Sequence, residues 1–303
     1  MSYNFTETQR DRIIKNWGQE IYLKILRDIE ICSKKWRLFD LVFHEYFSIN
    51  AIFFCKSEIY GDCVLKIGSD EQDELFPREY STLREYDGRR FVKVYESDID
   101  IKSRKKAMLI ERVIPGKMLS EEPLEKRIAV FSDLFNGLHI VPKNPEIYDT
   151  YEKLICDAAE ECKESRQDLK GLNEHMQKAK EIYFEICEKY NKKMLLHIDI
   201  YGDNILSDSD GYRIIDPKGV IGDPVFETGQ FLFAELCEND LHPENANIIF
   251  DYFEENLNID GKILRQCFYI ETVRFVSYYA TREGAKQHDV DRVNFAEAVM
   301  SEI

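Results

Sequence analysis

KMLLHIDIYGDNILSDSDGYRIIDPKG, residues 193–219, contains an apolar strand, a polar loop and a tight hairpin in succession. Its polar residues that can carry chemistry are His197, Asp199, Asn204 and Asp216. Residues 205–207 and 212–215 have strand character on either side of an S-D-S-D-G turn. Asn204 and Asp216 are equidistant from Asp210 at the centre of the turn, so cross-strand pairing is expected to bring the two side chains together.

The four polar residues predict phosphoryl-transfer chemistry. An amide oxygen from Asn204 and a carboxylate from Asp216 suit Mg²⁺, which prefers oxygen ligands and shares its other positions with phosphates and water. Asp199 lies five residues before Asn204 and can orient an acceptor hydroxyl and receive its proton. His197 is interpreted as a buried hydrogen-bonding support of this loop. The alternative is that these residues only cap loops, but the ordered pattern H-x-D-x-x-x-x-N, hairpin and Asp favours a catalytic role.

The first part of the chain predicts a small sheet. Short β-rich runs occupy 36–43, 50–56, 63–68, 89–97 and 105–113, with one helix over 71–88 after the third run. Thr6 and Gln9 have capping-box spacing and predict an amphipathic helix before the sheet. Ser120 is expected to cap a helix running towards Leu138, and the rest of the chain is mainly helical.

Lys66, in the strand V-L-K-I, needs an anionic partner if its side chain points inward. In the following helix, Glu79 lies on the same side as the apolar residues, so it is the first candidate, and Glu74 and Glu85 are alternatives. Such a pair would hold the lysine against the α- and β-phosphates of a nucleotide. The alternative is that Lys66 is only a solvent-exposed charge on an edge strand, without a role in binding.

These motifs resemble the aminoglycoside phosphotransferase and choline kinase group, and I-I-D-P-K-G is most similar to the streptomycin 6-kinase and hydroxyurea resistance kinase family. The resemblance extends to L-I-E-R-V-I-P-G at 109–116, G-L-H-I-V-P at 137–142 and G-D-P-V-F-E-T-G at 222–229. It implies an α+β, two-lobed protein-kinase-like fold. A five-stranded antiparallel sheet lobe would cover 1–113 and end in the hinge, and a mainly helical lobe would cover 114–303.

The resemblance also implies roles for single residues. Asp199 would be the catalytic base, Asn204 and Asp216 the Mg²⁺ ligands, Lys66 the phosphate clamp, and the backbone of Glu111 and Val113 the partners of the nucleotide base. Two positions depart from the family pattern: Ile198 replaces the usual Gly before the catalytic Asp, and Asp203 replaces a Gly before the metal-binding Asn. F-S-I-N-A-I at 47–52 has no glycine where a phosphate-covering loop is expected.

The charge distribution points to the acceptor. The chain carries a formal charge of -16, and residues 220–303 contain sixteen Asp and Glu against six Lys and Arg. In the resembled fold this section forms the acceptor pocket, where such an excess would attract a cation. The candidate acceptor-binding carboxylates are Asp223, Glu227, Glu235, Glu238 and Glu271. Solvated helix faces are the alternative explanation for each of them taken singly.

The same composition argues against other classes. A net negative chain does not suit nucleic acid, no apolar run approaches membrane-spanning length, and the first ten residues lack the pattern of a secretory signal. Eight scattered cysteines without a C-x-x-C pair are typical of reduced thiols, so a cytoplasmic protein is expected. Oligomeric state is left open by the sequence.

Three functions remain as hypotheses. The first is an aminoglycoside kinase that confers resistance and uses Mg²⁺ with ATP or GTP. The second is a kinase of an amino-alcohol, sugar or amino acid. The third, a nucleotide-binding module without transfer activity, is disfavoured because Lys66, Asp199, Asn204 and Asp216 are all present. A protein kinase is disfavoured because D-P-K-G stands in place of D-F-G and no A-P-E element is found.

Overall fold

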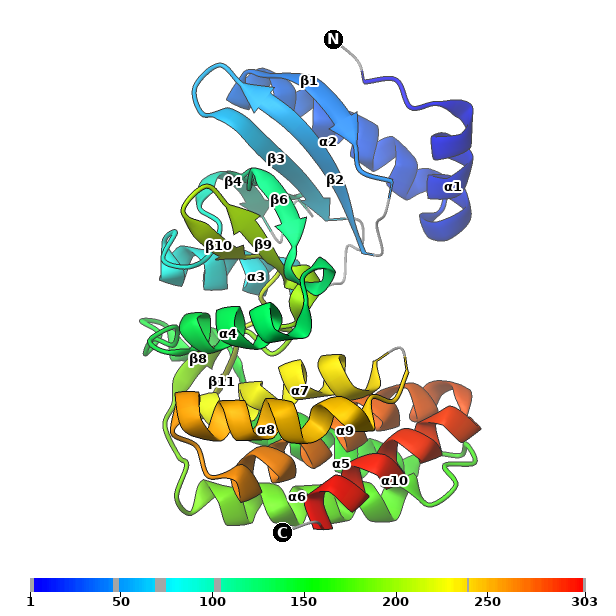
Figure 1. Ribbon diagram of the computed structural model, residues 1–303. Coiled ribbons are helices and arrows are strands. Elements are labelled where there is room, and N and C mark those ends of the chain that lie inside the picture. The colour runs from blue at the N-terminus through cyan, green and yellow to red at the C-terminus, as the bar shows by residue number, and fades with distance from the viewer. Residues whose placement is uncertain (1–2, 46–48, 69–74, 101–104, 239, 302–303) are drawn as a thin grey trace. The chain divides into compact units, whose positions relative to one another are not determined.

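The computed structural model describes residues 3–45, 49–68, 75–100, 105–238 and 240–301. They form two compact units. The first comprises Met1–Gly116 and Ser207–Ile215, and the second comprises Lys117–Leu206 and Asp216–Ile303. The fold is α+β, with a five-stranded antiparallel sheet in the first unit and a mainly helical second unit, as the sequence predicted (Figure 1). The predicted lobe boundary after residue 113 stays a prediction, and the structure groups Ser207–Ile215 with the first unit.

Two helices open the first unit, α1 (Glu7–Trp17) and α2 (Gln19–Trp36). The predicted capping box is confirmed: the Gln9 N–H donates to the Thr6 hydroxyl at 3.2 Å, and the Thr6 N–H donates to the Gln9 side chain at 3.0 Å. Gly18 has a φ of 91° and separates the two helices. Glycine adopts this conformation at little cost, which is why the expected single helix is divided into two.

The sheet has the antiparallel order β1-β2-β3-β5-β4. Its strands are β1 (Leu38–Phe43), β2 (Asn50–Ser57), β3 (Gly61–Gly68), β4 (Val94–Asp100) and β5 (Lys105–Glu111). One helix, α3 (Leu75–Tyr86), follows β3 and packs against β4 and β5. The five strands and the single inserted helix match the prediction, although the fourth strand begins at Val94 rather than near residue 89.

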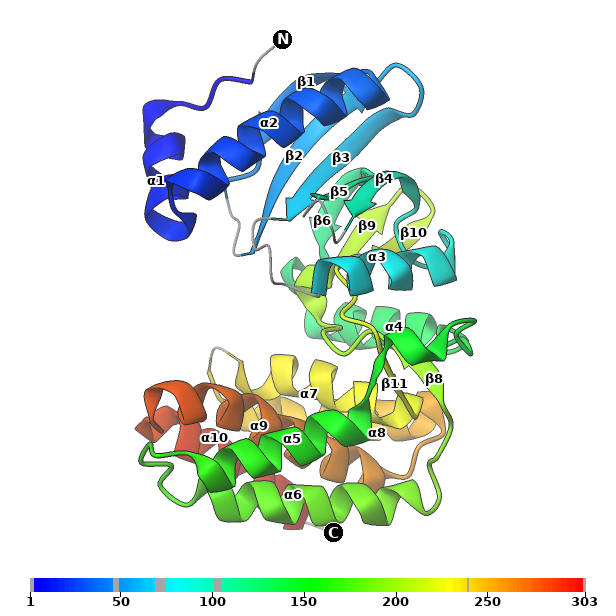
Figure 2. The ribbon, with the colours of Figure 1, turned by 180° about the vertical axis from the view of Figure 1, so that it is seen from behind.

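Helix α2 covers one face of this sheet (Figure 2). Ile25 and Ile29 of α2 are buried in one core cluster with Phe53 of β2 and Leu65 of β3. Burying each of these side chains contributes roughly 1.5–3 kcal/mol. Because neighbouring residues of a strand point to opposite faces, this packing turns Lys66 to the face away from α2.

The second unit is built around one long helix, α9 (Gly261–Glu283). Five helices pack against it: α5 (Tyr151–Glu164), α6 (Leu172–Cys187), α7 (Glu227–Cys237), α8 (Pro243–Leu257) and α10 (Gln287–Ser301). Helix α9 has twelve buried residues distributed around its axis, as a helix surrounded by others requires. A small sheet of order β7-β11-β8 completes the unit, with strands β7 (Asp149–Thr150), β8 (Met194–Leu196) and β11 (Val220–Gly222).

A second small sheet has the order β10-β9-β6. Its strands are β6 (Pro115–Met118), β9 (Ile205–Asp208) and β10 (Gly211–Ile214). Strands β9 and β10 form the hairpin that the sequence predicted around its S-D-S-D-G turn. The chain leaves the first unit within β6 and enters it again within β9.

The predicted helix cap at Ser120 is wrong. Ser120 lies in the short 3₁₀-helix η1 (Leu119–Glu121), and α4 (Leu124–Phe135) begins only after Pro123. Pro123 is the N-cap of this helix, and no side chain caps its first turn. The Ser120 hydroxyl instead bonds Asp203 of the 3₁₀-helix η3 (Gly202–Asn204).

All eight cysteines are free thiols, and six of them are buried. Within the residues that the structure describes, none of the helices combines the length and the apolar composition needed to cross a bilayer. The glycine-free stretch 47–52 and the first residues of the predicted helix 71–88 lie partly outside the described residues, as does Glu74.

Candidate active site

The candidate base lies in a tight turn directly after β8. His197 is fully buried, and its Nδ1 accepts the backbone N–H of Asp199 at 3.1 Å. The side chain of Asp199 is 35% exposed, so its carboxylate can reach a ligand. The bond fits the predicted support role of His197, because it fixes the main chain at the residue that carries the carboxylate.

Ile198, between these two residues, has a φ of 54°. This left-handed conformation is unfavourable for a β-branched residue and favourable for glycine. The geometry therefore explains why a Gly is usual at this position in the family that the sequence resembles. The Ile198 N–H donates to Oε1 of Glu227 at 2.7 Å, which holds the turn in this conformation.

Glu227 is a buried carboxylate at the start of α7, with a side chain that is 0% exposed. Its Oε2 lies 2.6 Å from Nε2 of His139, a residue to which the sequence gave no role. Burial alone raises the pKa of Glu227. The hydrogen bond and charge of His139, the charge of His197 and the Ile198 N–H outweigh burial and lower this pKa below its ordinary value of 4.5. Glu227 is thus held as an anion under the catalytic turn.

Lys218 makes two contacts with the same turn. Its backbone N–H donates to the carbonyl oxygen of His197 at 3.0 Å, and its Nζ lies 3.3 Å from Oδ2 of Asp199. Lys218 is the lysine of I-I-D-P-K-G, a residue for which the sequence pattern predicted no function. Its position two residues after Asp216, a candidate metal ligand, is the sequence feature that could have indicated a place near the active site.

The two predicted metal ligands belong to the second unit. Asn204 donates from Nδ2 to the carbonyl oxygen of Asp199 at 2.8 Å, and among the described residues none hydrogen-bonds its Oδ1. This bond orients the amide so that its oxygen can serve as a ligand. Asp216 has a φ of 56°, a conformation that Asp tolerates better than most residues.

Carboxylates gather around the phenol of Tyr201. Burial raises the pKa of Tyr201, and the charges of Asp199, Asp203, Glu238 and Asp216 raise it further. No described group of three or more His, Cys, Asp and Glu side chains could hold a metal alone. One amide oxygen and one carboxylate still fit Mg²⁺ when nucleotide phosphates and water fill its other positions.

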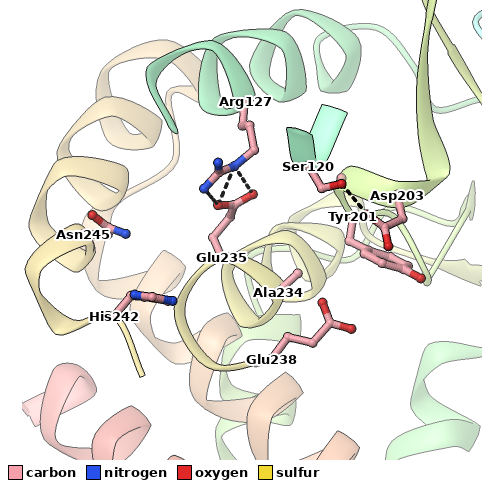
Figure 3. A pocket seen from close by; sticks show the side chains of 10 residues that line it. Ser120, Arg127, Tyr201, Asp203, Ala234, Glu235, Glu238, His242 and Asn245 are labelled. Carbon is pink, nitrogen blue, oxygen red and sulfur yellow. Dashed lines mark hydrogen bonds and ion pairs between the residues drawn. The ribbon is translucent and has the colours of Figure 1, made fainter. Parts of the chain in front are cut away.

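A cavity of about 320 Å³ lies beside the catalytic loop in the second unit (Figure 3). It is lined by Ser120, Arg127, Tyr201, Gly202, Asp203, Ala234, Glu235, Glu238, His242 and Asn245. Gly202 is required at its wall, since an added Cβ would lie 2.8 Å from the backbone nitrogen of Ser120. Asp203, the second departure from the family pattern, places a carboxylate at the cavity where a glycine would place none.

Two of the five predicted acceptor-binding carboxylates line this cavity. Glu235 is paired with Arg127, whose Nε lies 2.9 Å from both carboxylate oxygens (Figure 3). Burial raises the pKa of Glu238, and the nearby charges of Asp203, Asp199 and Glu235 raise it further, while Arg292 opposes them. The negative charges around Glu238 therefore outweigh the positive charge of Arg292, which leaves this carboxylate without full compensation.

The other three predicted acceptor carboxylates bind groups of the protein itself. Asp223 accepts the backbone N–H groups of Lys192 at 2.9 Å and Val225 at 3.1 Å. Glu227 holds the catalytic turn, as described above. Glu271 is fully buried and bonds Arg274, Gln230 and Tyr151. None of these three is among the residues that line the cavity.

In the first unit, Lys66 and Glu79 form the predicted ion pair, with Nζ and Oε1 2.8 Å apart and both side chains buried. The structure thus confirms the choice of Glu79 as the partner of Lys66. Lys66 lies on β3, the central strand of the sheet, and not on an edge.

The predicted hinge follows the end of β5 in the same unit. The backbone N–H of Glu111 donates to the carbonyl oxygen of Lys93 at 2.8 Å. Within the described part of the chain, the N–H of Val113 has no hydrogen-bond partner, so it can donate to a ligand. The roles of both residues towards a nucleotide base remain predictions.

Comparisons with solved structures agree with this fold. Choline kinase LicA from Streptococcus pneumoniae is 12% identical, with a TM-score of 0.67, over 93% of this chain and 99% of that chain. Aminoglycoside phosphotransferase APH(4)-Ia, as a thermostable mutant with ADP and hygromycin B, is 14% identical, with a TM-score of 0.63, over 89% and 97%. A choline/ethanolamine kinase family protein from Mesorhizobium loti is 12% identical, with a TM-score of 0.64, over 90% and 95%. At these identities the likeness establishes a protein-kinase-like fold.

The family assignment comes from the sequence. No curated protein matches the chain. The profile of the family described as aminoglycoside/hydroxyurea antibiotic resistance kinase matches residues 60–283, which is most of the chain and includes Lys66, Asp199 and Asp216. The chain therefore belongs to the aminoglycoside/hydroxyurea antibiotic resistance kinase family and is a phosphotransferase that acts on hydroxyl groups.

Proposed function

We propose that this protein transfers the γ-phosphoryl group of Mg-ATP or Mg-GTP to a hydroxyl group of a small, amine-bearing molecule of the aminoglycoside type. The observation that carries the proposal is the cavity beside the catalytic loop, where Glu238 and Asp203 add negative charge close to the candidate base. A cationic acceptor bound there would relieve this charge and lie near Asp199.

On the donor side, Lys66 is the proposed partner of the nucleotide phosphates. Glu79 fixes its ammonium at 2.8 Å in a buried setting, so little conformational freedom is lost when a phosphate binds. The N–H of Val113 and the carbonyl of Glu111 are the proposed partners of the nucleotide base. The structures similar in fold include complexes with ADP and AMP-PNP, which supports nucleotide use.

Asn204 and Asp216 are the proposed ligands of Mg²⁺. When bound, the ion neutralises phosphate charge and orients the γ-phosphoryl group. The fixed orientation of the Asn204 amide supports this assignment, as does its Oδ1, which has no hydrogen-bond partner in the described part of the chain. Titration with nucleotide in the presence and absence of Mg²⁺ tests it: an Asp216→Ala variant with an unchanged Mg²⁺ dependence would rule the assignment out.

Asp199 is the proposed general base. Its carboxylate accepts the proton of the acceptor hydroxyl as the acceptor oxygen bonds the γ-phosphorus. The bond between this phosphorus and the bridging oxygen breaks, and the nucleoside diphosphate leaves with that electron pair. The turn that carries Asp199 is fixed by Glu227, His197 and Lys218, so the carboxylate is positioned before substrate arrives.

The lining of the cavity favours amines over quaternary ammonium compounds such as choline. Quaternary ammonium groups are recognised by aromatic cages, whereas protonated amines donate hydrogen bonds to carboxylates. Of the described lining residues, a single one is Phe, Tyr or Trp, and three are carboxylates. A metabolite kinase that acts on another amine-bearing alcohol is the second candidate for the same reason.

The experiment is a turnover assay with purified protein and Mg-ATP or Mg-GTP. The acceptor panel contains streptomycin and other aminoglycosides, choline, simple sugars and amino acids. Strong stimulation by an aminoglycoside supports the proposal and a resistance role. Stimulation by choline or a neutral sugar alone would overturn the assigned acceptor class, and no transfer to any hydroxyl would favour a nucleotide-binding role.

A further inference from the structure

We propose that Lys218 is a positioning residue for the transfer step, because its ammonium group holds the Asp199 carboxylate in place to receive the proton of the acceptor hydroxyl. This inference rests on the proposed role of Asp199 as the base. It assigns a function to the lysine of I-I-D-P-K-G, which neither the metal site nor the acceptor cavity uses.

The main chain around Lys218 is fixed. Pro217 precedes it and restricts φ, and the Lys218 N–H bonds the carbonyl oxygen of His197 at 3.0 Å. Its side chain then returns to the same turn, where Nζ lies 3.3 Å from Oδ2 of Asp199. The lysine therefore contacts both ends of the three-residue turn that carries the candidate base.

Stability does not explain this ion pair. Both side chains are 35% exposed, and pairs this exposed add little to the free energy of unfolding. An ammonium group has three N–H donors, and among the described residues Asp199 is the partner of Nζ. The ammonium group can therefore direct its hydrogen bonding to this one carboxylate.

A second cation near the base, Arg274, already has a carboxylate partner. Burial lowers the pKa of Arg274, but the charge and hydrogen bonds of buried Glu271 and the charges of Tyr151 and Asp199 raise it overall. The Arg274 guanidinium bonds Glu271 through Nε at 2.9 Å. The charge of Arg274 is thus largely compensated by Glu271. Lys218, in contrast, is in direct contact with Asp199.

The positioning role follows the course of the reaction. Before transfer, the ammonium keeps the carboxylate in one orientation. As the acceptor oxygen bonds phosphorus and the bond to the nucleoside diphosphate breaks, the hydroxyl proton moves to Asp199, which becomes neutral. Lys218 forms and breaks no covalent bond in this step.

The test is a double-mutant cycle with Asp199→Asn, Lys218→Met and the combined variant, with Lys218→Arg as the conservative change. The assay uses Mg-ATP with the panel acceptor that gives the fastest turnover, or with water if hydrolysis is fastest. Lys218→Met is expected to lower kcat by about 10- to 100-fold while the KM for Mg-ATP changes less than about threefold, and Lys218→Arg to recover part of the loss. In the Asp199→Asn background the same change should alter kcat by less than about threefold, because the lysine acts through the missing carboxylate.

Lys178→Met is the matched control. Lys178 forms a similar part-exposed pair with Glu297, at 2.6 Å, with exposed fractions of 44% and 36%. Its loss should leave kcat unchanged, and both methionine variants should melt close to wild type. The inference is overturned if Lys218→Met keeps the wild-type kcat while Asp199→Asn loses it, or if the two losses multiply in the combined variant. Two other outcomes would overturn the proposed function itself: an Asp199→Asn variant with the kcat of the wild type, or a wild-type protein without any turnover.

Discussion

Oε1 of Glu227 accepts the backbone N–H of Ile198 at 2.7 Å, so a buried carboxylate fixes the residue that precedes the candidate base. The second oxygen of Glu227 lies 2.6 Å from His139. Through this arrangement Glu227, at the start of α7, fixes the conformation of the catalytic turn, although Glu227 is not among the residues that line the cavity.

Replacing Glu227 tests this arrangement. Glu227→Ala leaves the Ile198 N–H and His139 without their acceptor, and we expect the free energy of unfolding to fall by about 3 kcal/mol and kcat by at least 10-fold. Glu227→Gln keeps an acceptor for Ile198 and should lose less. Urea unfolding and steady-state kinetics measure both, and wild-type kcat in the alanine variant would contradict the role given to Glu227.

The Glu227 carboxylate also predicts a pH dependence. Its pKa is lower in the folded protein than its ordinary value of 4.5, so its ionised form stabilises the fold above that pH. This contribution should disappear as the pH falls from 4.5 through the lower folded pKa. The stability difference between wild type and Glu227→Gln is therefore expected to be constant above about pH 5.5 and to shrink on acidification. A difference that grows with acidification has the wrong sign for this explanation.

At position 198, a glycine substitution should be less destabilising than an alanine substitution. At a φ of 54°, alanine is strained and glycine is not, so Ile198→Gly should be more stable than Ile198→Ala by about 1 kcal/mol. Ile205 is the control, because its φ is -121° and alanine should be the better replacement there. Thermal unfolding of the four variants measures both orders. The same order at both positions would contradict the strained turn.

Lys66→Met should weaken Mg-ATP binding by about 10- to 100-fold through loss of a charge-assisted phosphate contact. The control is Lys24→Met, since Lys24 also forms a buried ion pair in the first unit, with Asp28 at 2.9 Å. Both variants should lose stability, because each removes the ammonium partner of a buried carboxylate. Only Lys66→Met should lose nucleotide affinity in calorimetry, and an equal loss in both would assign Lys66 a purely structural role.

Glu238→Gln should raise the KM of a cationic acceptor by about 10-fold with little change in kcat, as expected when one half-buried charge attraction is removed. The pKa of Glu238 is raised above its ordinary value of 4.5, mainly by burial. As the pH is lowered, this carboxylate should therefore become protonated, and acceptor affinity should decrease, before the pH reaches 4.5. Glu244→Gln serves as control, since that side chain is 66% exposed and outside the cavity lining. An unchanged KM in Glu238→Gln would remove it from the acceptor site.

Much of the fold was predictable because it depends on local patterns. The short β-rich runs of the strands, the capping box at Thr6 and the spacing of Glu79 on its helix can all be recognised from neighbouring residues, and each is confirmed. The family resemblance added the kinase-like fold class. The Ser120 cap failed because Pro123, three residues later, sets the start of the helix.

The support of the catalytic turn was not predictable from local patterns. Glu227 lies 29 residues from Ile198 and 88 from His139, so no local periodicity connects them. The excess of carboxylates near the C-terminus was a sound observation, but it could not separate Glu238 at the cavity from Glu271 in the core. That distinction depends on how α7 and α9 pack, which charge counts do not contain.

The most direct test of the central claim compares Asp199→Asn with wild type in two assays, Mg-nucleotide binding and phosphoryl transfer to the best acceptor of the panel. Loss of the base should lower kcat by about 100-fold or more, while the Kd for Mg-nucleotide stays within about threefold of wild type. A variant that keeps its kcat, or that loses binding and transfer together, would contradict Asp199 as the base of a hydroxyl kinase.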